Sequence, residues 1–199
     1  QPYAPPAGWP DGCIQIYVAG VAKGRKPGEP IPPSGYGVIV VEKHTRVFLI
    51  SGPVTAAEPG VTTATDYLAS LVAVTRALEW AAVDGVYAGR PIILRFSEPY
   101  GPNVASDVWR GKTHKAMAAR AKRAWTRLKK RQTPVWLAHL SSKNFNAFAS
   151  GAFALANAGP ARPPHVWPTS TRRRLTTEIY RRLRAPGAGA ERRRRRPGP

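Results

Sequence analysis

The chain has 199 residues, of which 43% are hydrophobic, so it is long enough for one folded domain with an additional segment. Its formal charge of +20 comes from 31 Lys and Arg against 11 Asp and Glu. A field of this sign attracts polyanions such as RNA, DNA or acidic lipid surfaces, and charge alone does not choose among them. Cys13 is the only cysteine, which excludes an intrachain disulfide and a cysteine metal cluster.

The start of the chain predicts a leader rather than a targeting signal. Residues 1–12 are rich in Pro and Gly and lack the basic start and apolar stretch of a signal peptide. No run of about 18 apolar residues occurs, so no transmembrane segment is expected. We therefore expect an intracellular protein, in the cytoplasm or nucleus and not secreted. Since the chain lacks an initiator Met, we expect either a processed product or a fragment of something longer.

Three strands are expected in the first part of the chain, over residues 13–20, 35–41 and 46–52. The first alternates apolar and polar residues, and Pro residues make 21–34 a loop. Only residues 42–45 separate the second strand from the third, and so short a link predicts a hairpin. These strands should form an antiparallel meander.

Helices and strands alternate in the next part of the chain. Apolar residues recur at helical spacing in residues 64–83, a segment rich in Ala and Leu. Further helices are expected over 113–131 and 144–158, strands over 91–96 and 134–140, and one short helix within 97–112. Long helical connections suit parallel pairing with right-handed crossovers. The order predicts an α/β domain over residues 13–158, with a five-stranded mixed sheet flanked by helices.

Residues 159–199 are predicted to form a flexible basic tail. Four prolines between residues 160 and 168 forbid a continuous helix, and the segment carries 12 Arg against two Glu. Residues 171–184 suit one short basic helix. The end is of low complexity and includes five consecutive arginines, Arg192, Arg193, Arg194, Arg195 and Arg196.

The first predicted strand carries a family resemblance. Ile16-Tyr17-Val18-Ala19-Gly20 is followed by Lys26-Pro27-Gly28 and Gly35-Tyr36-Gly37. This arrangement resembles the opening of a ribonuclease H, where the first strand ends in a pattern like I-Y-T-D-G. The position of the family's aspartate is Ala19 in this chain.

Three later motifs continue the resemblance over about 140 residues, and each has a neutral residue at the carboxylate position. Thr65-Asp66-Tyr67-Leu68-Ala69-Ser70 resembles T-N-N-x-x-E, with Ser70 at the glutamate. Arg95-Phe96-Ser97-Glu98 resembles Y-T-D-S, with Ser97 at the aspartate. Asn146-Ala147-Phe148-Ala149-Ser150 resembles N-E-x-x-D, with Ser150 at the aspartate. The family's loop histidine falls at Leu140, one residue after His139.

The resemblance implies a retained fold and a lost metal site. Ribonucleases H hold two divalent ions with four carboxylates, and Mg²⁺ needs hard anionic oxygens that Ala and Ser do not supply. Asp66 lies one turn before Ser70 and Glu98 lies next to Ser97, whereas Asp107 falls in a loop that the sequence does not place. One or two misplaced carboxylates do not make a two-metal site. We therefore expect no catalytic residues at Ala19, Ser70, Ser97 and Ser150, no metal ligands and no cofactor. Mg²⁺ enters only in the alternative of an active nuclease.

Residues 110–131 contain ten Lys and Arg and no acidic residue. They predict a surface that follows phosphates, although an ordinary solvated helix face is the competing interpretation. Trp125 and Trp136 are expected in the core. For Trp109, which falls in a loop, both a core position and stacking on a base remain possible interpretations. The candidate nucleic-acid contacts, besides the five consecutive tail arginines, are Lys112, Lys115, Lys122, Arg123, Arg127, Lys129, Lys130, Arg131 and Asn146.

The favoured interpretation is an inactive ribonuclease H-like domain that binds RNA, DNA or their hybrid through a basic surface. The resemblance also suggests a part or a descendant of a retroelement or viral polyprotein, of the reverse transcriptase type, whose remainder would be a partner. Two alternatives stay open. One is an active RNA–DNA hybrid ribonuclease with unusual metal ligands, and the other is a protein-interaction scaffold in a ribonucleoprotein or polymerase complex.

Overall fold

A computed structural model describes residues 11–22, 34–55, 65–83, 89–161 and 165–168. The expected leader up to residue 10 and the arginine-rich end from residue 169 lie outside these ranges. None of the helices in the described ranges has the length and hydrophobicity needed to cross a bilayer.

The first three strands form the antiparallel meander that the sequence predicts. They are β1 (Ile14–Ala22), β2 (Ser34–Glu42) and β3 (Thr45–Val54), and β2 pairs antiparallel with both of its neighbours. Lys43 and His44 turn the β2–β3 hairpin with φ of 47° and 63°. Positive φ at both central residues matches the twist of a two-residue hairpin loop, so the short link forms the expected turn.

The later strands add to β1 in parallel. β4 (Ile92–Phe96) pairs with β1, and β5 (Val135–His139) pairs with β4. The five expected strands and their mixed pairing are therefore confirmed. A sixth strand, β6 (His165–Pro168), was not predicted; it pairs antiparallel with β3 and completes the order β5-β4-β1-β2-β3-β6.

β6 lies in the segment that the sequence analysis assigned to the tail. A strand of four residues is too short to show a period in the sequence, and it ends in Pro168. Proline is tolerated in a strand at the edge of a sheet, because its missing N–H is needed there on one side only. The proline-rich composition of this segment therefore gave no signal for a strand, although β6 pairs with the edge of β3.

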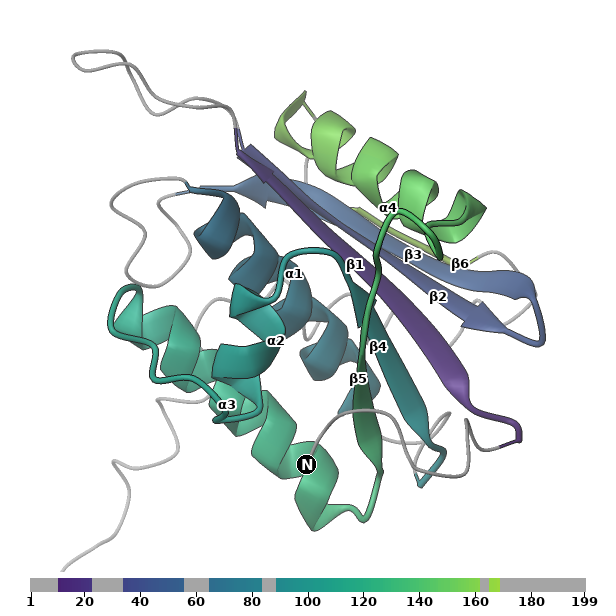
Figure 1. The fold of residues 1–199 in the computed structure, drawn as a ribbon, viewed down its shortest axis with the longest axis horizontal. Helices are drawn as coiled ribbons and strands as arrows, with labels where there is room; N and C mark the ends of the chain where they lie inside the picture. Colours follow the sequence, from purple (N-terminus) through teal and green to yellow (C-terminus); the bar gives the residue numbers. More distant parts are fainter. Residues whose placement is uncertain (1–10, 23–33, 56–64, 84–88, 162–164, 169–199) are drawn as a thin grey trace, which may run out of the picture.

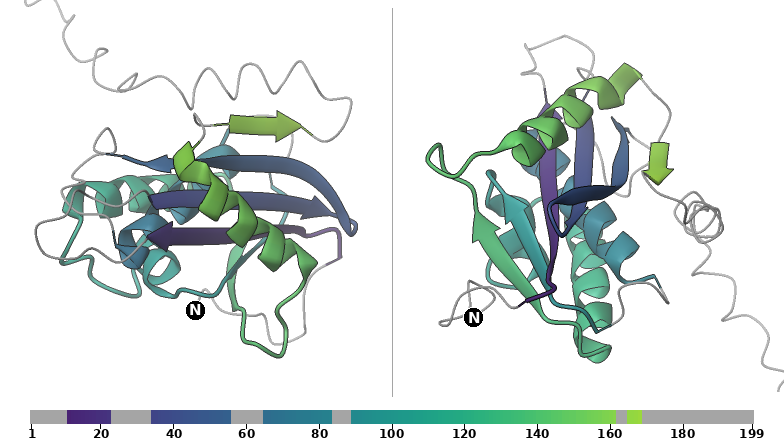
Figure 2. Two further views of the ribbon diagram at one scale, coloured as in Figure 1. Left: turned by 90° about the horizontal axis from the view of Figure 1, so that it is seen from above. Right: turned by 90° about the vertical axis from the view of Figure 1, so that its right-hand side faces the viewer.

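Helices cover both faces of the sheet (Figures 1 and 2). Three of them lie on one face: α1 (Asp66–Ala81), α2 (Tyr100–Ala105) and α3 (Lys115–Lys130). The fourth, α4 (Ala147–Ala158), crosses the opposite face and runs into a short 3-10 helix, η1 (Gly159–Ala161). Thr65 caps α1 by accepting from the backbone N–H of Leu68 at 3.2 Å.

The two faces have different cores. Large aliphatic and aromatic side chains from β1–β5 pack against α1, α2 and α3. On the other face, Ala149, Ala152 and Ala156 of α4 lie close to the sheet. A Cβ added to Gly37 would lie 2.2 Å from the carbonyl oxygen of Ala152, so only glycine permits this approach.

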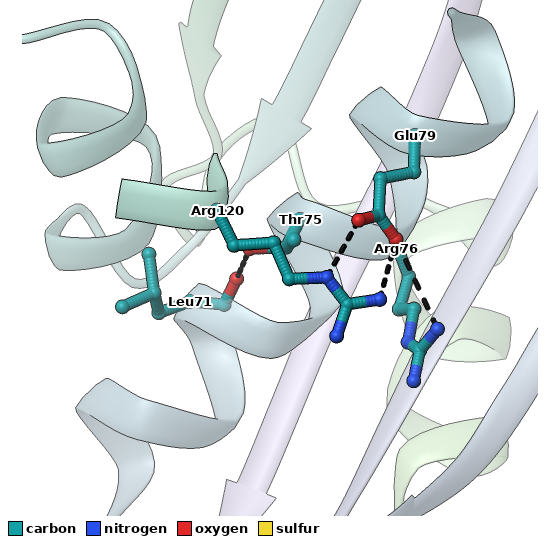
Figure 3. A network of polar contacts seen from close by, with 5 residues as sticks. All are labelled: Leu71, Thr75, Arg76, Glu79 and Arg120. Atoms are coloured by element: carbon teal, nitrogen blue, oxygen red, sulfur yellow. Dashed lines mark hydrogen bonds and ion pairs between the residues drawn. The ribbon is translucent and has the colours of Figure 1, made fainter. Parts of the chain in front are cut away.

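An ion-pair network fixes α3 against α1 (Figure 3). The carboxylate of Glu79 accepts from Nε and Nη2 of Arg120 at 2.6 and 2.8 Å, and Nη1 of Arg76 lies 3.8 Å from it. Both arginines and the carboxylate are largely buried. The bidentate geometry sets how α3 is rotated, and it leaves most of the other cations of α3 on the opposite side.

Candidate functional site

Three of the four positions that the resemblance aligns with carboxylates meet at one end of the sheet. β1 and β4 are parallel neighbours, and continuing their register sets Ala19 opposite Ser97. Ser70 reaches this end from α1, where its Oγ donates to the backbone oxygen of Glu98 at 3.4 Å. Ala19 and Ser70 are buried, with 5% and 3% of their surfaces exposed.

Close backbone packing holds Ser70 in this position. A Cβ added to Gly20 would lie 2.1 Å from the backbone carbon of Ala69 and 2.2 Å from the nitrogen of Ser70. One added to Gly101 would lie 2.9 Å from the Oγ of Ser70. The end of β1 and the start of α2 therefore press directly on α1.

Ser150 approaches from the other layer. It is the fourth residue of α4, and its side chain is exposed. Its neighbour Ala149 is buried in the same cluster as Ala19. The start of α4 thus packs against the end of β1, while the side chain of Ser150 faces outward from that cluster.

We call Ala19, Ser70, Ser97 and the more exposed Ser150 the neutral centre. The carboxylates of Asp66 and Glu98, near this centre, and that of Asp107, farther along the chain, already have partners. Oδ1 of Asp66 accepts from the backbone N–H of Ala22 at 2.8 Å, and Oε2 of Glu98 accepts from that of Tyr100 at 2.9 Å. Asp107 forms an ion pair with Lys122. Within the described ranges, no group of three or more His, Cys, Asp or Glu side chains is arranged to hold a metal ion.

Glu98 follows Ser97 directly, and its backbone oxygen accepts from Oγ of Ser70. Burial raises the pKa of its carboxyl above the ordinary 4.5, and the hydrogen bond from the backbone N–H of Tyr100 opposes this rise. The opposite holds at Asp107, where the hydrogen bond from Lys122 and its charge lower the pKa. Glu98 is therefore a desolvated group at the centre, while Asp107 belongs to the exposed charged surface.

The residues aligned with the family's loop histidine lie near Ser97. Leu140 is buried in the cluster that contains Ala19. His139 is exposed, and its Nε2 lies 3.1 Å from the backbone oxygen of Ser97. The imidazole is thus occupied with a backbone contact at the sheet end.

Asn146 has a structural role in addition to its predicted one. Its Oδ1 caps α4 by accepting from the backbone N–H groups of Phe148 and Ala149, both at 3.0 Å. Its Nδ2 donates to the hydroxyl of Tyr17 at 3.0 Å. These bonds tie the start of α4 to β1.

One side of α3 is basic. Met117, Ala121, Ala124, Trp125 and Leu128 point into the core, and Trp125 is buried as predicted. The exposed cations on the opposite side form what we call the α3 basic face, which consists of Lys115, Arg123, Arg127, Lys129 and Lys130.

Three further residues that were predicted to contact nucleic acid do not belong to the α3 basic face. Lys112 is exposed in the connection before α3. Lys122 pairs with Asp107, an acid just before the run that the sequence analysis counted as free of acids. Arg131 donates through Nη1 to the backbone oxygen of Ala82, at the end of α1. Lys122 and Arg131 therefore contribute to the scaffold.

Two tryptophans outside α3 are partly accessible. Trp109 is 44% exposed in the connection between α2 and α3. Trp136 lies in β5 at the side of the sheet and is half-buried. The expected core position of Trp136 is therefore met only in part, because no strand lies beyond β5 in the described sheet.

An aromatic pair that was not predicted from the sequence lies beside the centre. Tyr67, in the first turn of α1, is 58% exposed, and its ring centroid lies 5.4 Å from that of Tyr100. Tyr67 precedes Ser70 by three residues, and Tyr100 precedes Gly101, which contacts Ser70. The sequence signal that could have indicated this pair was a large aromatic residue, Tyr67, in the first turn of a predicted helix. The predicted tail contacts, from Arg192 to Arg196, lie outside the described residues.

Comparisons with known proteins identify the architecture. No protein-family profile and no curated protein sequence matches the chain. Solved structures do match. LC11-RNase H1, isolated from compost by a metagenomic approach, is 17% identical with a TM-score of 0.57, covering 75% of this chain and 96% of that one.

Archaeal and viral structures match as well. RNase H1 of Halobacterium salinarum is 23% identical with a TM-score of 0.53, over 74% of this chain and 97% of that one. The PFV RNase H domain is 16% identical with a TM-score of 0.54, over 74% and 94%. All three similarities lie below 25% sequence identity, and each spans nearly the whole of the matched structure, so they concern the fold. The chain therefore contains a domain with the ribonuclease H-like fold.

Proposed function

We propose that this chain is a ribonuclease H-like domain that binds nucleic acid but does not cleave it by two-metal chemistry. The observation that carries the proposal is the neutral centre: Ala19, Ser70 and Ser97 meet at the sheet end where the resemblance expects carboxylates. Ser150 stands at the fourth position on α4. Neutral side chains do not supply the anionic oxygens that Mg²⁺ needs, so these residues do not fit the family's two ions.

The neighbouring carboxylates do not offer a replacement site. Asp66 and Glu98 accept hydrogen bonds from the backbone, and Asp107 pairs with Lys122. Within the described residues, these carboxylates are not grouped with further His, Cys, Asp or Glu side chains into a set of three or more that could hold a metal ion. This argues against an active nuclease with unusual ligands.

Binding is supported by charge and by the similar structures. The α3 basic face carries five exposed cations, and counterion release makes such faces bind phosphates without reading sequence. LC11-RNase H1 has been solved in complex with an RNA/DNA hybrid, and a foamy viral protease-reverse transcriptase in complex with dsDNA. We extend nucleic-acid binding to this chain, for RNA, DNA or hybrid.

The proposal includes the wider setting. A foamy viral protease–reverse transcriptase is among the similar structures, and this chain covers 21% of one such polypeptide. We propose that the domain is part of, or descended from, a retroelement or viral polyprotein. We further propose that it acts inside the cell, in the cytoplasm or nucleus, where nucleic acid is available.

Cleavage and binding assays test the central proposal together. The full chain should leave a labelled RNA–DNA hybrid intact in Mg²⁺ and in Mn²⁺, yet bind it in a shift assay. Arg127→Glu, on the α3 basic face, should weaken hybrid binding and lower the slope of log affinity against log salt by about one unit. Lys43→Glu, an equal charge change at the exposed β2–β3 turn, should have less effect.

Either of two results would contradict the proposal. Metal-dependent cleavage that is lost on replacing Asp66 or Glu98 would identify an active nuclease. Equal effects of Arg127→Glu and Lys43→Glu would assign binding to net charge alone rather than to the α3 basic face.

The tail makes a separate contribution in this proposal. Because β6 ends at Pro168, a truncation should begin at residue 169 so that the strand is kept. Removing residues 169–199 should weaken binding to duplexes of every sequence alike. If about five tail arginines contact phosphates, the salt slope should fall by roughly four to five units. An unchanged slope would assign the tail to protein contacts instead.

A further inference from the structure

The Tyr67–Tyr100 pair lies at the rim of the neutral centre. The two rings are tilted by 46° with their centroids 5.4 Å apart. Tyr100 is oriented by its hydroxyl, which lies 3.0 Å from Oγ1 of Thr113. Tyr67 lies against this fixed ring and still has 58% of its surface exposed. The pair therefore presents an aromatic face to solvent instead of filling the core.

Cations flank the same place. Thr113, which holds Tyr100, lies between Lys112 and Lys115, and both lysines are exposed. The two nearby carboxylates, of Asp66 and Glu98, each accept a hydrogen bond from a backbone N–H, which offsets part of their charge. An aromatic face beside two exposed lysines suits a ligand with both a π-face and negative charge.

We propose that Tyr67 and Tyr100 form a stacking platform for an unpaired nucleobase, with Lys112 and Lys115 contacting the adjoining phosphates. This inference rests on the proposed function and gives it a substrate class. Every nucleobase has a π-face, so stacking on tyrosine is tolerant of sequence. A base inside a duplex is already stacked on its neighbours, so the platform selects single strands.

The sequence of the first turn of α1 differs from the family pattern at Tyr67. In the motif that resembles T-N-N-x-x-E, Tyr67 stands where the pattern has its second asparagine. The polar residue has thus been exchanged for an aromatic ring three residues before the neutral Ser70. The same short segment loses a metal ligand and gains a stacking surface.

Three probes separate stacking from charge. Fluorescence anisotropy would be measured with an oligothymidylate of about 12 nucleotides, an abasic strand of equal length and a blunt duplex of equal length. Tyr67→Ala should weaken oligothymidylate binding about fivefold to tenfold and leave the abasic strand and the duplex unchanged. Tyr67→Trp should retain the affinity, because the aromatic face is kept.

The matched control is Phe145→Ala. Phe145 is 42% exposed in the segment before α4, and its ring lies beside that of Phe153, away from the Tyr67–Tyr100 pair in the chain and in its contacts. This variant should bind all three probes as the parent chain does. Thermal unfolding of each variant checks that the fold is kept, which is expected for exposed side chains.

The outcomes distinguish this inference from the proposed function. If the parent chain binds all three probes and Tyr67→Ala changes none of them, or all of them equally, the stacking platform is wrong while nucleic-acid binding stands. Such a result would leave the pair to protein contacts. If the parent chain binds none of the probes, both the inference and the proposed function fail.

Discussion

The two faces of the sheet are held by different kinds of packing. On the α1 face, side chains such as Leu71, Leu78 and Leu94 fill the space between helix and sheet. On the α4 face, Ala152 and Ala156 approach the glycines of β2 so closely that backbone meets backbone. The first face is held mainly by a large cluster of buried apolar side chains, with one close backbone approach at Gly20. The second combines a smaller apolar cluster with close backbone approaches at both Gly35 and Gly37.

The difference bears on the neutral centre, which takes one residue from each layer. Ser70 comes from α1, Ser150 from α4 and Ala19 from β1, and Ser97 directly follows β4. None of the four carries charge, so the two layers meet here without the repulsion that clustered carboxylates would cause. The contacts that hold the two layers here are the close backbone approach at Gly20, the packing of Gly101 on Ser70 and the hydrogen bond from Ser70 Oγ.

Filling the space on the α4 face should have the largest effect on stability. A Cβ at Gly37 would lie 2.2 Å from the oxygen of Ala152 and 2.8 Å from the nitrogen of Ala156, and neither backbone atom can rotate away. We expect Gly37→Val to cost about 3 kcal/mol or more in urea unfolding, as overpacking does when the backbone must shift.

A substitution on the surface of α3 serves as the control for Gly37→Val. Ala119→Val adds the same β-branched group at an exposed helical position and should cost less than about 1 kcal/mol. A cost for Gly37→Val as small as that of Ala119→Val would mean that α4 moves freely on the sheet. The contrast between the two faces would then be wrong.

Restoring charge at the centre tests whether the two layers still define one site. The variant combines Ala19→Asp, Ser70→Glu, Ser97→Asp and Ser150→Asp. Without metal it should be less stable than the parent chain, because four carboxylates repel one another and two of them are buried. Mg²⁺ at about a hundredfold excess over its Kd should raise its Tm by roughly 5 °C relative to chelator.

The control for this variant is neutral and of equal size. A chain with Asn and Gln at the same four positions should show no difference between Mg²⁺ and chelator in thermal unfolding. If the charged variant also shows none, the four positions do not share a site, and the register of at least one motif is wrong.

Much of the fold could be predicted because its signals are local. Helical spacing in residues 64–83 and the short link before Thr45 each determine an element without reference to the rest of the chain. Placing Ala19, Ser70 and Ser97 together needed the family resemblance, because their proximity is created only when β4 pairs in parallel with β1.

The features that the sequence did not reveal depend on tertiary contacts. β6 is too short to have a visible period and exists as a partner of β3. The ion pair of Lys122 joins it to an acid that lies outside the run of cations. Tyr67 belongs to a motif, yet its exposure and its contact with Tyr100 depend on how α2 meets α1.

The smallest expected effect concerns Glu98, which lies where α1 and α2 meet. Burial raises the pKa of its carboxyl above 4.5, so the folded chain holds this proton more tightly than the unfolded chain does. Its contribution to stability is therefore complete at low pH and is lost as the pH rises through the folded pKa. Glu98→Gln keeps an oxygen that can accept from the backbone N–H of Tyr100, and it removes the charge.

The stability of Glu98→Gln relative to the parent chain should therefore rise between about pH 4 and about pH 7, as measured by urea unfolding at each pH. The change should be small, because the carboxyl is half-exposed and water screens it. Asp107→Asn is the matched carboxyl control: the hydrogen bond from Lys122 and the charge of Lys122 lower the pKa at Asp107 and outweigh the smaller rise that burial causes there. Its relative stability should fall over the same pH range or stay level. If Glu98→Gln instead loses relative stability as the pH rises, the ionised carboxylate stabilises the junction of α1 and α2, and the centre favours negative charge despite its four neutral residues.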